Sequence, residues 1–136
     1  MSEQPTIQIQ TKPQGKVLSN YRYSTARVQM IRGPLGSGKT MESCQKIFAF
    51  MCNQQPNEEG IRPSRFVAIR NTFPDLANTT IKDWLELYRD LGHYTQGGVE
   101  PPHQNLEFEL DDGTIVNSEI IFLALDRDSV GKRKKQ

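Results

Sequence analysis

The sequence has little of several features that would suggest a function on their own. Its 136 residues include two cysteines, two histidines and one tryptophan, and 17 basic against 16 acidic residues leave a net charge of +1. A charge this balanced gives no overall field that would draw the chain to nucleic acid or to a membrane. No apolar run approaches a membrane span of about 20 residues, and the polar residues 1–10 do not resemble a signal peptide. We therefore expect a soluble, intracellular protein.

The few cysteines and histidines do not form a metal-binding pattern. Cys44 and Cys52 lie in a stretch whose apolar spacing predicts a helix, which separates them by roughly 12 Å along its axis, too far for a disulfide. Neither cysteine has a second CxxC pair or a neighbouring histidine, and His93 and His103 have no partner at metal-binding spacing. We expect buried, reduced thiols, two loop histidines and no zinc.

What is present is a glycine-rich phosphate-binding loop. Eight consecutive residues match the P-loop pattern G-x-x-x-x-G-K-S/T, namely Gly33, Pro34, Leu35, Gly36, Ser37, Gly38, Lys39 and Thr40. Glycines let the backbone approach phosphates closely, and successive N–H groups at a helix N-terminus form an anion nest. We expect Lys39 to neutralise the β and γ phosphates of ATP and Thr40 to bind Mg²⁺. About 1% of chains of this length would match by chance.

Apolar spacing around this loop predicts alternating strands and helices. Short apolar runs at 28–31 and 66–69 indicate buried strands, and apolar residues at helical intervals indicate a helix over 41–52, followed by a loop over 53–64. A second helix is expected to begin at Asn78 or Thr79 and to end at Gly92. Its apolar face comprises Ile81, Trp84, Leu85, Tyr88 and Leu91.

The C-terminal part of the chain has a strand pattern. Residues 106–110 and 114–117 flank the turn signal Asp111-Asp112-Gly113 and predict a β-hairpin, and the apolar run 120–125 is suited to a central strand. Together these elements predict an α/β P-loop NTPase fold with a mainly parallel sheet, flanking helices and an added hairpin. We expect a flexible arm over 1–20, a partial P-loop ATPase domain over 21–126 and a polar basic tail over 127–136.

Hydrolysis of ATP requires an acidic residue that holds Mg²⁺, usually at the end of an apolar strand. Asp126 follows five apolar residues, as in a Walker-B strand, and is therefore a candidate Mg²⁺ ligand. The alternative is that Asp126 is an ordinary surface residue at a strand end. Arg127 follows it, where a second acid would be expected.

From about Arg27 to Asp126 the chain resembles the N-terminal ATPase region of the large terminase subunit of tailed phages. The resemblance rests on Arg32 with the P-loop, on 67–76 with its Arg70-Asn71-Thr72 segment, on 79–84, and on the hairpin that leads into 121–126. It implies an ATP- and Mg²⁺-dependent motor that packages double-stranded DNA. It also implies a small terminase subunit and a portal as partners, a possible homo-oligomeric ring, and the cytoplasm of an infected bacterium.

Two departures from the family alter what the resemblance implies. Many large terminases have an arginine, proposed to reach the γ-phosphate, where this chain has Leu35. Arg32 and Arg70 are the local candidates for this role, and the alternative is an arginine from a neighbouring subunit. The more ordinary role of Arg32 and Arg70 is a surface salt bridge or hydrogen bond. The family also continues beyond the strand that ends like Asp126, with the Walker-B strand, its catalytic glutamate and a nuclease. We therefore expect a truncated subunit that binds ATP with little or no turnover, and this weakens Asp126 as the metal ligand.

Two other functions fit the same residues. A small self-sufficient P-loop enzyme such as a nucleotide kinase would need Asp126 on the metal and an arginine-rich lid, and a non-catalytic remnant would need neither. Trp84 is expected in the core rather than on a nucleic-acid surface. Tyr21 or Tyr23 could stack on adenine or pack at the start of the first strand. The residues Lys132–Lys135 could contact DNA or remain solvated.

Overall fold

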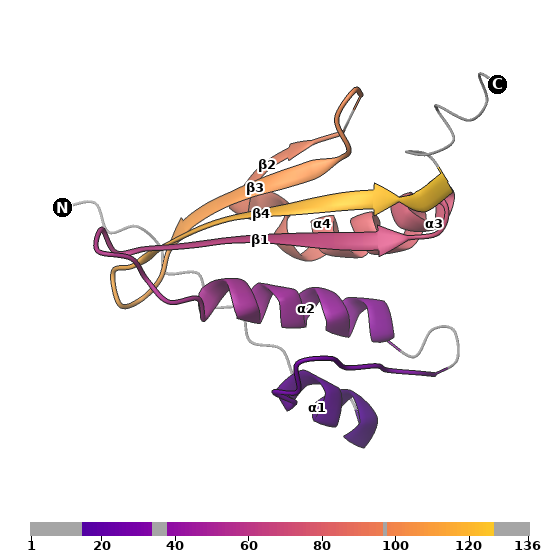
Figure 1. Cartoon of the computed structure of the whole chain (residues 1–136), viewed down its shortest axis with the longest axis horizontal. Helices are drawn as coiled ribbons and strands as arrows, with labels where there is room; N and C mark the ends of the chain where they lie inside the picture. Colours follow the sequence, from indigo (N-terminus) through magenta and orange to yellow (C-terminus); the bar gives the residue numbers. More distant parts are fainter. Residues whose placement is uncertain (1–14, 34–37, 97, 127–136) are drawn as a thin grey trace.

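The computed structural model describes residues 15–33, 38–96 and 98–126. It is an α/β fold with a four-stranded mixed sheet (Figure 1). In chain order the elements are α1 (Lys16–Tyr23), α2 (Lys39–Cys52), β1 (Ile61–Arg70), α3 (Phe73–Asp75), the π-helical turn η1 (Leu76–Ile81), α4 (Lys82–Tyr88), the 3-10 turn η2 (Arg89–Leu91), β2 (Gly92–Thr95), β3 (His103–Glu109) and β4 (Ile115–Ala124).

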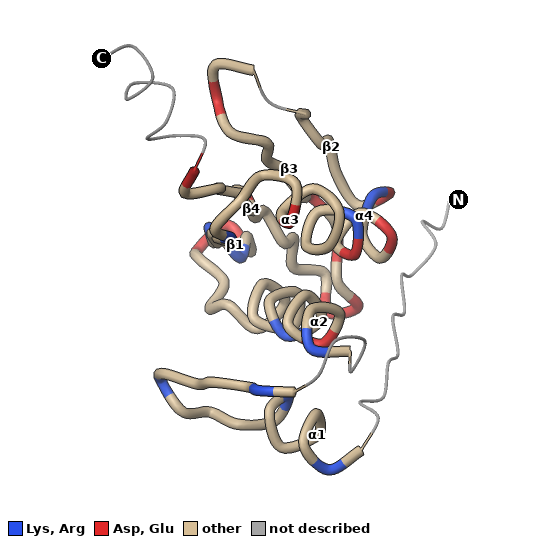
Figure 2. Tube along the Cα trace, turned by 90° about the vertical axis from the view of Figure 1, so that its right-hand side faces the viewer, with Lys and Arg blue, Asp and Glu red and all other residues tan. Residues whose placement is uncertain are grey.

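The elements form three layers. Both α2 and α4 lie on the same side of the sheet, and α1 lies beyond α2, on the side that faces away from the strands (Figures 1 and 2). None of the helices in the described ranges is long and apolar enough to cross a membrane. The expected tail 127–136, with Lys132–Lys135, and residues 1–14 of the expected arm lie outside the described residues.

The sheet has the strand order β1-β4-β3-β2, and only the β1–β4 pair is parallel. The prediction of a mainly parallel sheet is therefore wrong, because β2, β3 and β4 follow one another through short connections that impose antiparallel pairing. The expected hairpin return at 114–117 and the expected strand at 120–125 are one strand, β4. It pairs with β1 on one side and β3 on the other, so its central position is confirmed.

The first strand of the sheet is longer than its apolar core suggested. The prediction placed a loop over 53–64, but β1 begins at Ile61 and includes Pro63. Proline cannot donate a hydrogen bond to a neighbouring strand and is tolerated on an edge strand. In the described part of the chain, β1 pairs with β4 alone, which makes it such an edge.

The predicted strand at 28–31 is not formed. This segment runs along the outer side of α2, close to α1, and does not join the sheet (Figure 1). Val28 and Met30 are 87% and 85% exposed there. An apolar run forms a strand only where another strand can satisfy its backbone groups, and at this place no strand is adjacent. Residues 16–20, expected within the flexible arm, belong instead to α1.

The helical stretch after β1 begins earlier than predicted. Its N-cap is Thr72, whose hydroxyl accepts a hydrogen bond from Asp75 N at 3.3 Å, and Pro74 occupies the first turn. Asn78 and Thr79 are not caps but lie inside the π-helical turn. The signal for a cap at Thr72 was available, because Phe73, Leu76 and Ala77 follow it at helical intervals and Pro74 suits a first helical turn. The predicted end is confirmed, since Gly92 is the first residue of β2.

The core lies between the sheet and the two helices. Trp84 is fully buried, as predicted, and Phe48 stacks on Tyr88 with ring centroids 4.3 Å apart and on Phe108 at 5.5 Å. Of the apolar face expected for the second helix, four of the five residues are buried and Leu85 is partly buried. The buried apolar residues are Cys44, Met51, Leu76, Ile81, Trp84, Tyr88, Leu91, Leu106, Val116, Ile120, Phe122 and Ala124.

Both cysteines are free, as predicted, and their surroundings make them poor nucleophiles. Burial raises the pKa of the Cys44 thiol to about 12 and that of Cys52 to about 11, so both stay protonated at neutral pH. No group of three or more potential metal ligands occurs within the described ranges. The two histidines lie in strands, His93 in β2 and His103 in β3, and not in loops as predicted.

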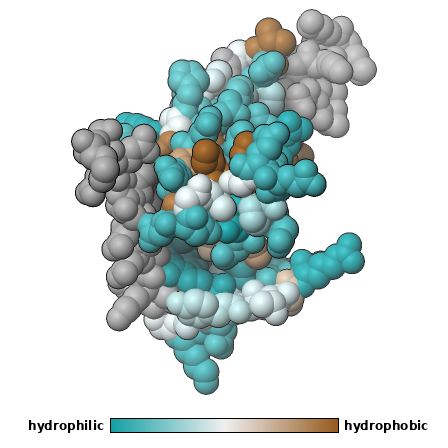
Figure 3. Space-filling view, turned by 90° about the vertical axis from the view of Figure 1, so that its left-hand side faces the viewer, coloured by the Kyte–Doolittle hydropathy of each residue, from teal (hydrophilic) through white to brown (hydrophobic). Residues whose placement is uncertain are grey.

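The turn before β4 has the predicted sequence signature. Gly113 has φ 86°, and the Asp112 carboxylate accepts hydrogen bonds from the backbone N (2.9 Å) and hydroxyl (2.5 Å) of Thr114. Those two bonds, with Arg62 at 2.9 Å, lower the pKa of Asp112 to about 2. This end of the sheet belongs to the face shown in Figure 3, which is mainly hydrophilic with small apolar spots.

Candidate nucleotide-binding site

The P-loop helix begins at the edge of the sheet where the two parallel strands end (Figure 1). β1 ends at Arg70, and its guanidinium Nη2 donates to the hydroxyl of Thr40, in the first turn of α2, at 3.2 Å. β4 ends beside β1, with Ala124 opposite Arg70. Ligands of α/β proteins bind at the carboxyl ends of parallel strands. The predicted site therefore lies where the fold itself favours a ligand.

The two ends of the P-loop are described, whereas Pro34, Leu35, Gly36 and Ser37 lie outside the described residues. Gly38 is the N-cap of α2, with φ 86° and ψ 9°, a left-handed conformation that glycine adopts without a steric penalty. Its carbonyl accepts the first helical hydrogen bond, from Glu42 N at 2.9 Å. The glycine that the motif requires before the lysine thus has a local structural reason.

The motif lysine reaches back across the loop. Lys39 Nζ donates to the carbonyl oxygen of Gly33 at 2.6 Å, so the side chain joins the last part of the motif to its first residue. A phosphate oxygen is a stronger acceptor for an ammonium group than a neutral carbonyl is. This contact between the two described ends of the motif is one that an anion could replace.

The residues present fit a magnesium–triphosphate group in their chemistry. An ammonium group and the positive end of a helix dipole favour phosphate, and the Thr40 hydroxyl supplies an oxygen ligand of the kind Mg²⁺ prefers. In the structure that oxygen accepts the hydrogen bond from Arg70. Of the two arginines predicted near the phosphates, Arg70 is therefore in contact with the motif. Arg32 is exposed at the start of the loop.

Asp126 serves as a structural cap. Its carboxylate Oδ1 accepts a hydrogen bond from Phe73 N, the first residue of α3, at 3.1 Å, and its own N donates to Asn71 O at 3.0 Å. A carboxylate at this position satisfies an N–H group that the helix leaves unpaired. This contact through Oδ1 gives the acid at the end of β4 a structural role, and its role as a Mg²⁺ ligand stays a prediction.

The capping role predicts how two substitutions at Asp126 should differ. Asp126→Ala removes the acceptor and is expected to cost about 1 kcal/mol of unfolding free energy, while Asp126→Asn keeps an acceptor and should cost only a few tenths. Urea denaturation measures both. Neither substitution should change the Mg²⁺ dependence of ATP binding; a clear loss of that dependence in Asp126→Asn would instead identify a metal ligand.

The outer face of α2 is polar and holds α1. Buried Lys46 donates to the carbonyl oxygens of Tyr21 and Ser24 and to the side chain of Gln29, and its Nζ lies 4.6 Å from the centre of the Tyr21 ring. A cation at the C-terminal end of α1 also complements the helix dipole. The Tyr21 hydroxyl pairs with Ser43 Oγ at 3.0 Å. Tyr21 is thus packed between the two helices; the expected packing at the start of a strand at 28–31 does not occur, because that strand is not formed.

A buried ion pair adds to this contact. Arg22 of α1 binds the carboxylate of Glu42, which is 4% exposed, with Nη2–Oε2 at 2.8 Å, and it also donates to Gln45. The hydrogen bond to Glu42 raises the pKa of Arg22. Because Glu42 lies one turn from the P-loop and Arg22 on α1, the pair fixes the position of α1 relative to the P-loop helix.

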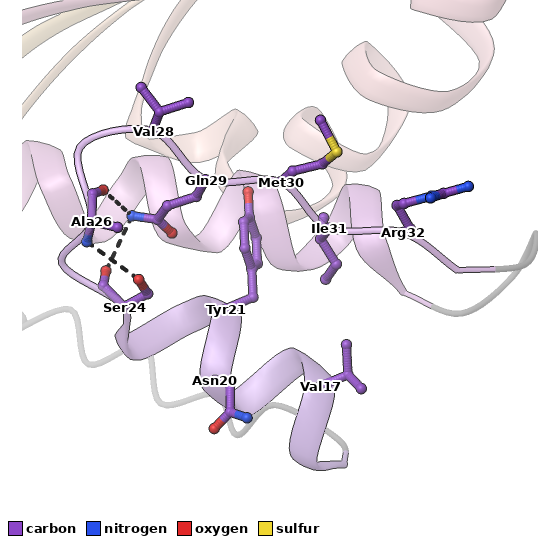
Figure 4. A pocket seen from close by; sticks show the side chains of 10 residues that line it. All are labelled: Val17, Asn20, Tyr21, Ser24, Ala26, Val28, Gln29, Met30, Ile31 and Arg32. Atoms are coloured by element: carbon purple, nitrogen blue, oxygen red, sulfur yellow. Dashed lines mark hydrogen bonds between the residues drawn. The ribbon is translucent and has the colours of Figure 1, made fainter.

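A pocket of about 400 Å³ lies between α1 and the segment that leads into the P-loop (Figure 4). Its wall extends to Arg32, one residue before the motif. The sequence analysis missed it, because α1 was assigned to the arm; the apolar spacing of Val17, Leu18 and Tyr21 was the available signal. The lining residues are Val17, Asn20, Tyr21, Ser24, Ala26, Val28, Gln29, Met30, Ile31 and Arg32.

Comparisons of the chain with protein-family models, with curated protein sequences and with solved structures returned no match.

Proposed function

We propose that this protein binds a nucleoside triphosphate with Mg²⁺ at the N-terminus of α2. The observation that carries the proposal is the Lys39 ammonium held 2.6 Å from the Gly33 carbonyl, across a loop whose last glycine has φ 86°. An anion that enters the loop meets this ammonium and the positive end of a 14-residue helix. When bound, the metal would neutralise phosphate charge, and Thr40 is the residue that would hold it.

The positive charge of residues 15–33, which lead into the P-loop, supports a polyanionic ligand. Residues 15–33 contain four basic side chains and no acidic one, as the blue segments of the α1 region in Figure 2 show. Three of these, Lys16, Arg27 and Arg32, are exposed. The pocket between α1 and residues 26–32 extends to Arg32, one residue before the motif, and is our proposed place for the nucleoside.

We further propose that the nucleotide is ATP and that the protein is the ATP-binding part of a phage DNA-packaging motor. The support is the resemblance over 27–126, whose more specific segment is Arg70-Asn71-Thr72. Arg70 contacts the P-loop helix and Thr72 caps the following helix, so two residues of this segment have defined roles beside the motif. Double-stranded DNA, a small terminase subunit, a portal, a ring of like subunits and the host cytoplasm are proposed on the same ground.

A titration with a fluorescent ATP analogue tests nucleotide binding. ATP with Mg²⁺ should bind and raise the unfolding midpoint; at a ligand concentration 100 times Kd the gain is about 2.7 kcal/mol. Lys39→Ala removes a charge-assisted contact and should weaken binding roughly ten- to hundredfold. The matched control is Lys82→Ala, an exposed lysine at the start of α4, which should bind as the wild type does. Equal affinity of all three proteins would refute the proposal.

We expect little or no steady hydrolysis from this chain. Two described carboxylates near the motif already make structural contacts, Asp126 with Phe73 N and Glu42 with Arg22. These contacts make both carboxylates less available to activate a water molecule. Turnover measured by phosphate release, with and without double-stranded DNA, checks this, and sustained DNA-stimulated activity would favour a complete enzyme over the binding function proposed here.

A further inference from the structure

We propose that Arg70 and Mg²⁺ compete for the Thr40 hydroxyl, so that binding of the metal–nucleotide pair releases Arg70 and loosens the π-helical turn η1. Arg70 would then be a positioning residue that reports the state of the nucleotide site to the helix that follows β1. This inference rests on the proposed binding of a nucleotide at α2.

The geometry begins with one guanidinium that joins two elements. Arg70 Nη2 donates to Thr40 Oγ1 in α2 and to Thr79 Oγ1 in η1, both at 3.2 Å, and its Nε donates to Thr80 Oγ1 at 3.0 Å. Three neutral hydroxyls thus hold a half-buried cation. In the part of the chain that the structure describes, no carboxylate lies within ion-pairing distance of it.

The contact with Thr40 would place a guanidinium beside a metal bound at the same hydroxyl. The hydroxyl oxygen has two lone pairs, and Arg70 already uses one of them, so both cations would share one oxygen. Two cations at one oxygen also repel each other, most strongly where burial excludes water. Mg²⁺ at Thr40 therefore favours a position of the guanidinium away from Thr40. A phosphate group would attract the released guanidinium.

Release from Thr40 affects η1 because a single nitrogen makes both contacts. When Nη2 moves away from Thr40 it also leaves Thr79, whose hydroxyl donates to Asp75 O at 2.5 Å. Thr79 is thus fixed from two sides. π-Helical turns are rare and less regular than α-helix, so the loss of one side-chain contact should make the backbone of η1 open more often. η1 also places Leu76 and Ile81 in the core, and it leads directly into α4.

Hydrogen–deuterium exchange of residues 71–81 tests the proposal. The wild-type protein is compared without nucleotide, with ATP and EDTA, and with ATP and Mg²⁺, and nucleotide binding is measured in the same samples. Exchange in η1 should become roughly three- to tenfold faster on addition of Mg²⁺, the factor expected for one lost hydrogen bond. In Arg70→Gln, exchange should already be fast without nucleotide and should not respond to Mg²⁺.

The matched control is Arg62→Gln. Arg62 lies near the other end of β1 and also binds a threonine hydroxyl, that of Thr114 at 2.9 Å, but it contacts neither α2 near the motif nor η1. This variant should keep the response of η1 to Mg²⁺. Thr79→Val, which removes only one partner of Arg70, should lose the response and serves if Arg70→Gln does not fold.

The outcomes separate this inference from the proposed function. If ATP with Mg²⁺ does not bind, both are refuted. If it binds and the exchange of η1 is the same with Mg²⁺ as with EDTA, the coupling through Arg70 is refuted and nucleotide binding stands. A response to Mg²⁺ that persists in Arg70→Gln and Thr79→Val would likewise overturn the role of Arg70.

Discussion

Replacing Gly92 with alanine is expected to cost about 3 kcal/mol of unfolding free energy or more, a large part of what a domain of this size possesses. A Cβ atom at this position would lie 1.9 Å from Asn105 O and 2.7 Å from Asn105 C. These are backbone atoms of β3, paired with β2, so no side chain can move aside. Relief requires β2 to separate from β3, and with it the end of the η2 turn from the sheet.

Gly113→Ala is the matched control, because this substitution introduces backbone strain without the close backbone contact that an alanine at Gly92 would make. Gly113 has φ 86° but no atom within 4 Å of an added Cβ, so only backbone strain of about 1 kcal/mol is expected. Urea denaturation of both variants measures the difference. Equal losses would show that crowding at Gly92 is relieved by small shifts, contrary to the argument from backbone contact.

Gly92 also shows what a sequence pattern can and cannot establish. A glycine after an apolar helical face predicts the end of a helix, and the helical stretch does end there. The usual reason is a left-handed cap, yet Gly92 has φ −178°, an extended conformation open to any residue. The requirement for glycine comes from Asn105, 13 positions along the chain, and a local pattern contains no information on such an approach.

The same distinction explains which elements were predicted. The helix after the P-loop and strand β4 carry long apolar patterns of their own, so local spacing was enough to find them. The run 28–31 has an equally apolar pattern but no strand beside it, and Val28 remains 87% exposed. β2 has only four residues and pairs with β3, so its existence depends on that partner.

At the candidate site, the sequence predicted the components but not how they are connected. The P-loop motif predicted the roles of Lys39 and Thr40, and the family resemblance predicted a role for Arg70. The contact between Arg70 and Thr40 joins residues 30 positions apart, and the contact of Asp126 with Phe73 spans 53. The first depends on the packing of α2 against β1, and the second on the parallel pairing of β1 with β4, which brings their ends together. Asp126 ends an apolar strand as a Walker-B acid does, and its hydrogen bond from Phe73 N is a second role that the local pattern does not contain.

Gln104→Leu is the second substitution with a large expected effect, about 2–4 kcal/mol of unfolding free energy. Gln104 is fully buried, and its amide joins three elements. Its Oε1 accepts from Trp84 Nε1 at 2.6 Å, and its Nε2 donates to the carbonyl oxygens of Tyr88 at 3.0 Å and Gly92 at 3.3 Å. Leucine fills a similar volume but removes the acceptor of the buried indole N–H and the donor to these two carbonyls.

Asn105→Leu makes the same kind of change one residue away, on the exposed face of β3, and should alter stability by no more than about 0.5 kcal/mol. Trp84 is the one tryptophan of the sequence, so its fluorescence reports on the hydrogen bond directly. In Gln104→Leu the native emission should change along with the urea midpoint, whereas Asn105→Leu should leave both nearly as in the wild type. If the two variants unfolded at the same urea concentration, the amide of Gln104 would contribute no more than its volume, and the connection between α4 and β3 would rest on apolar packing alone.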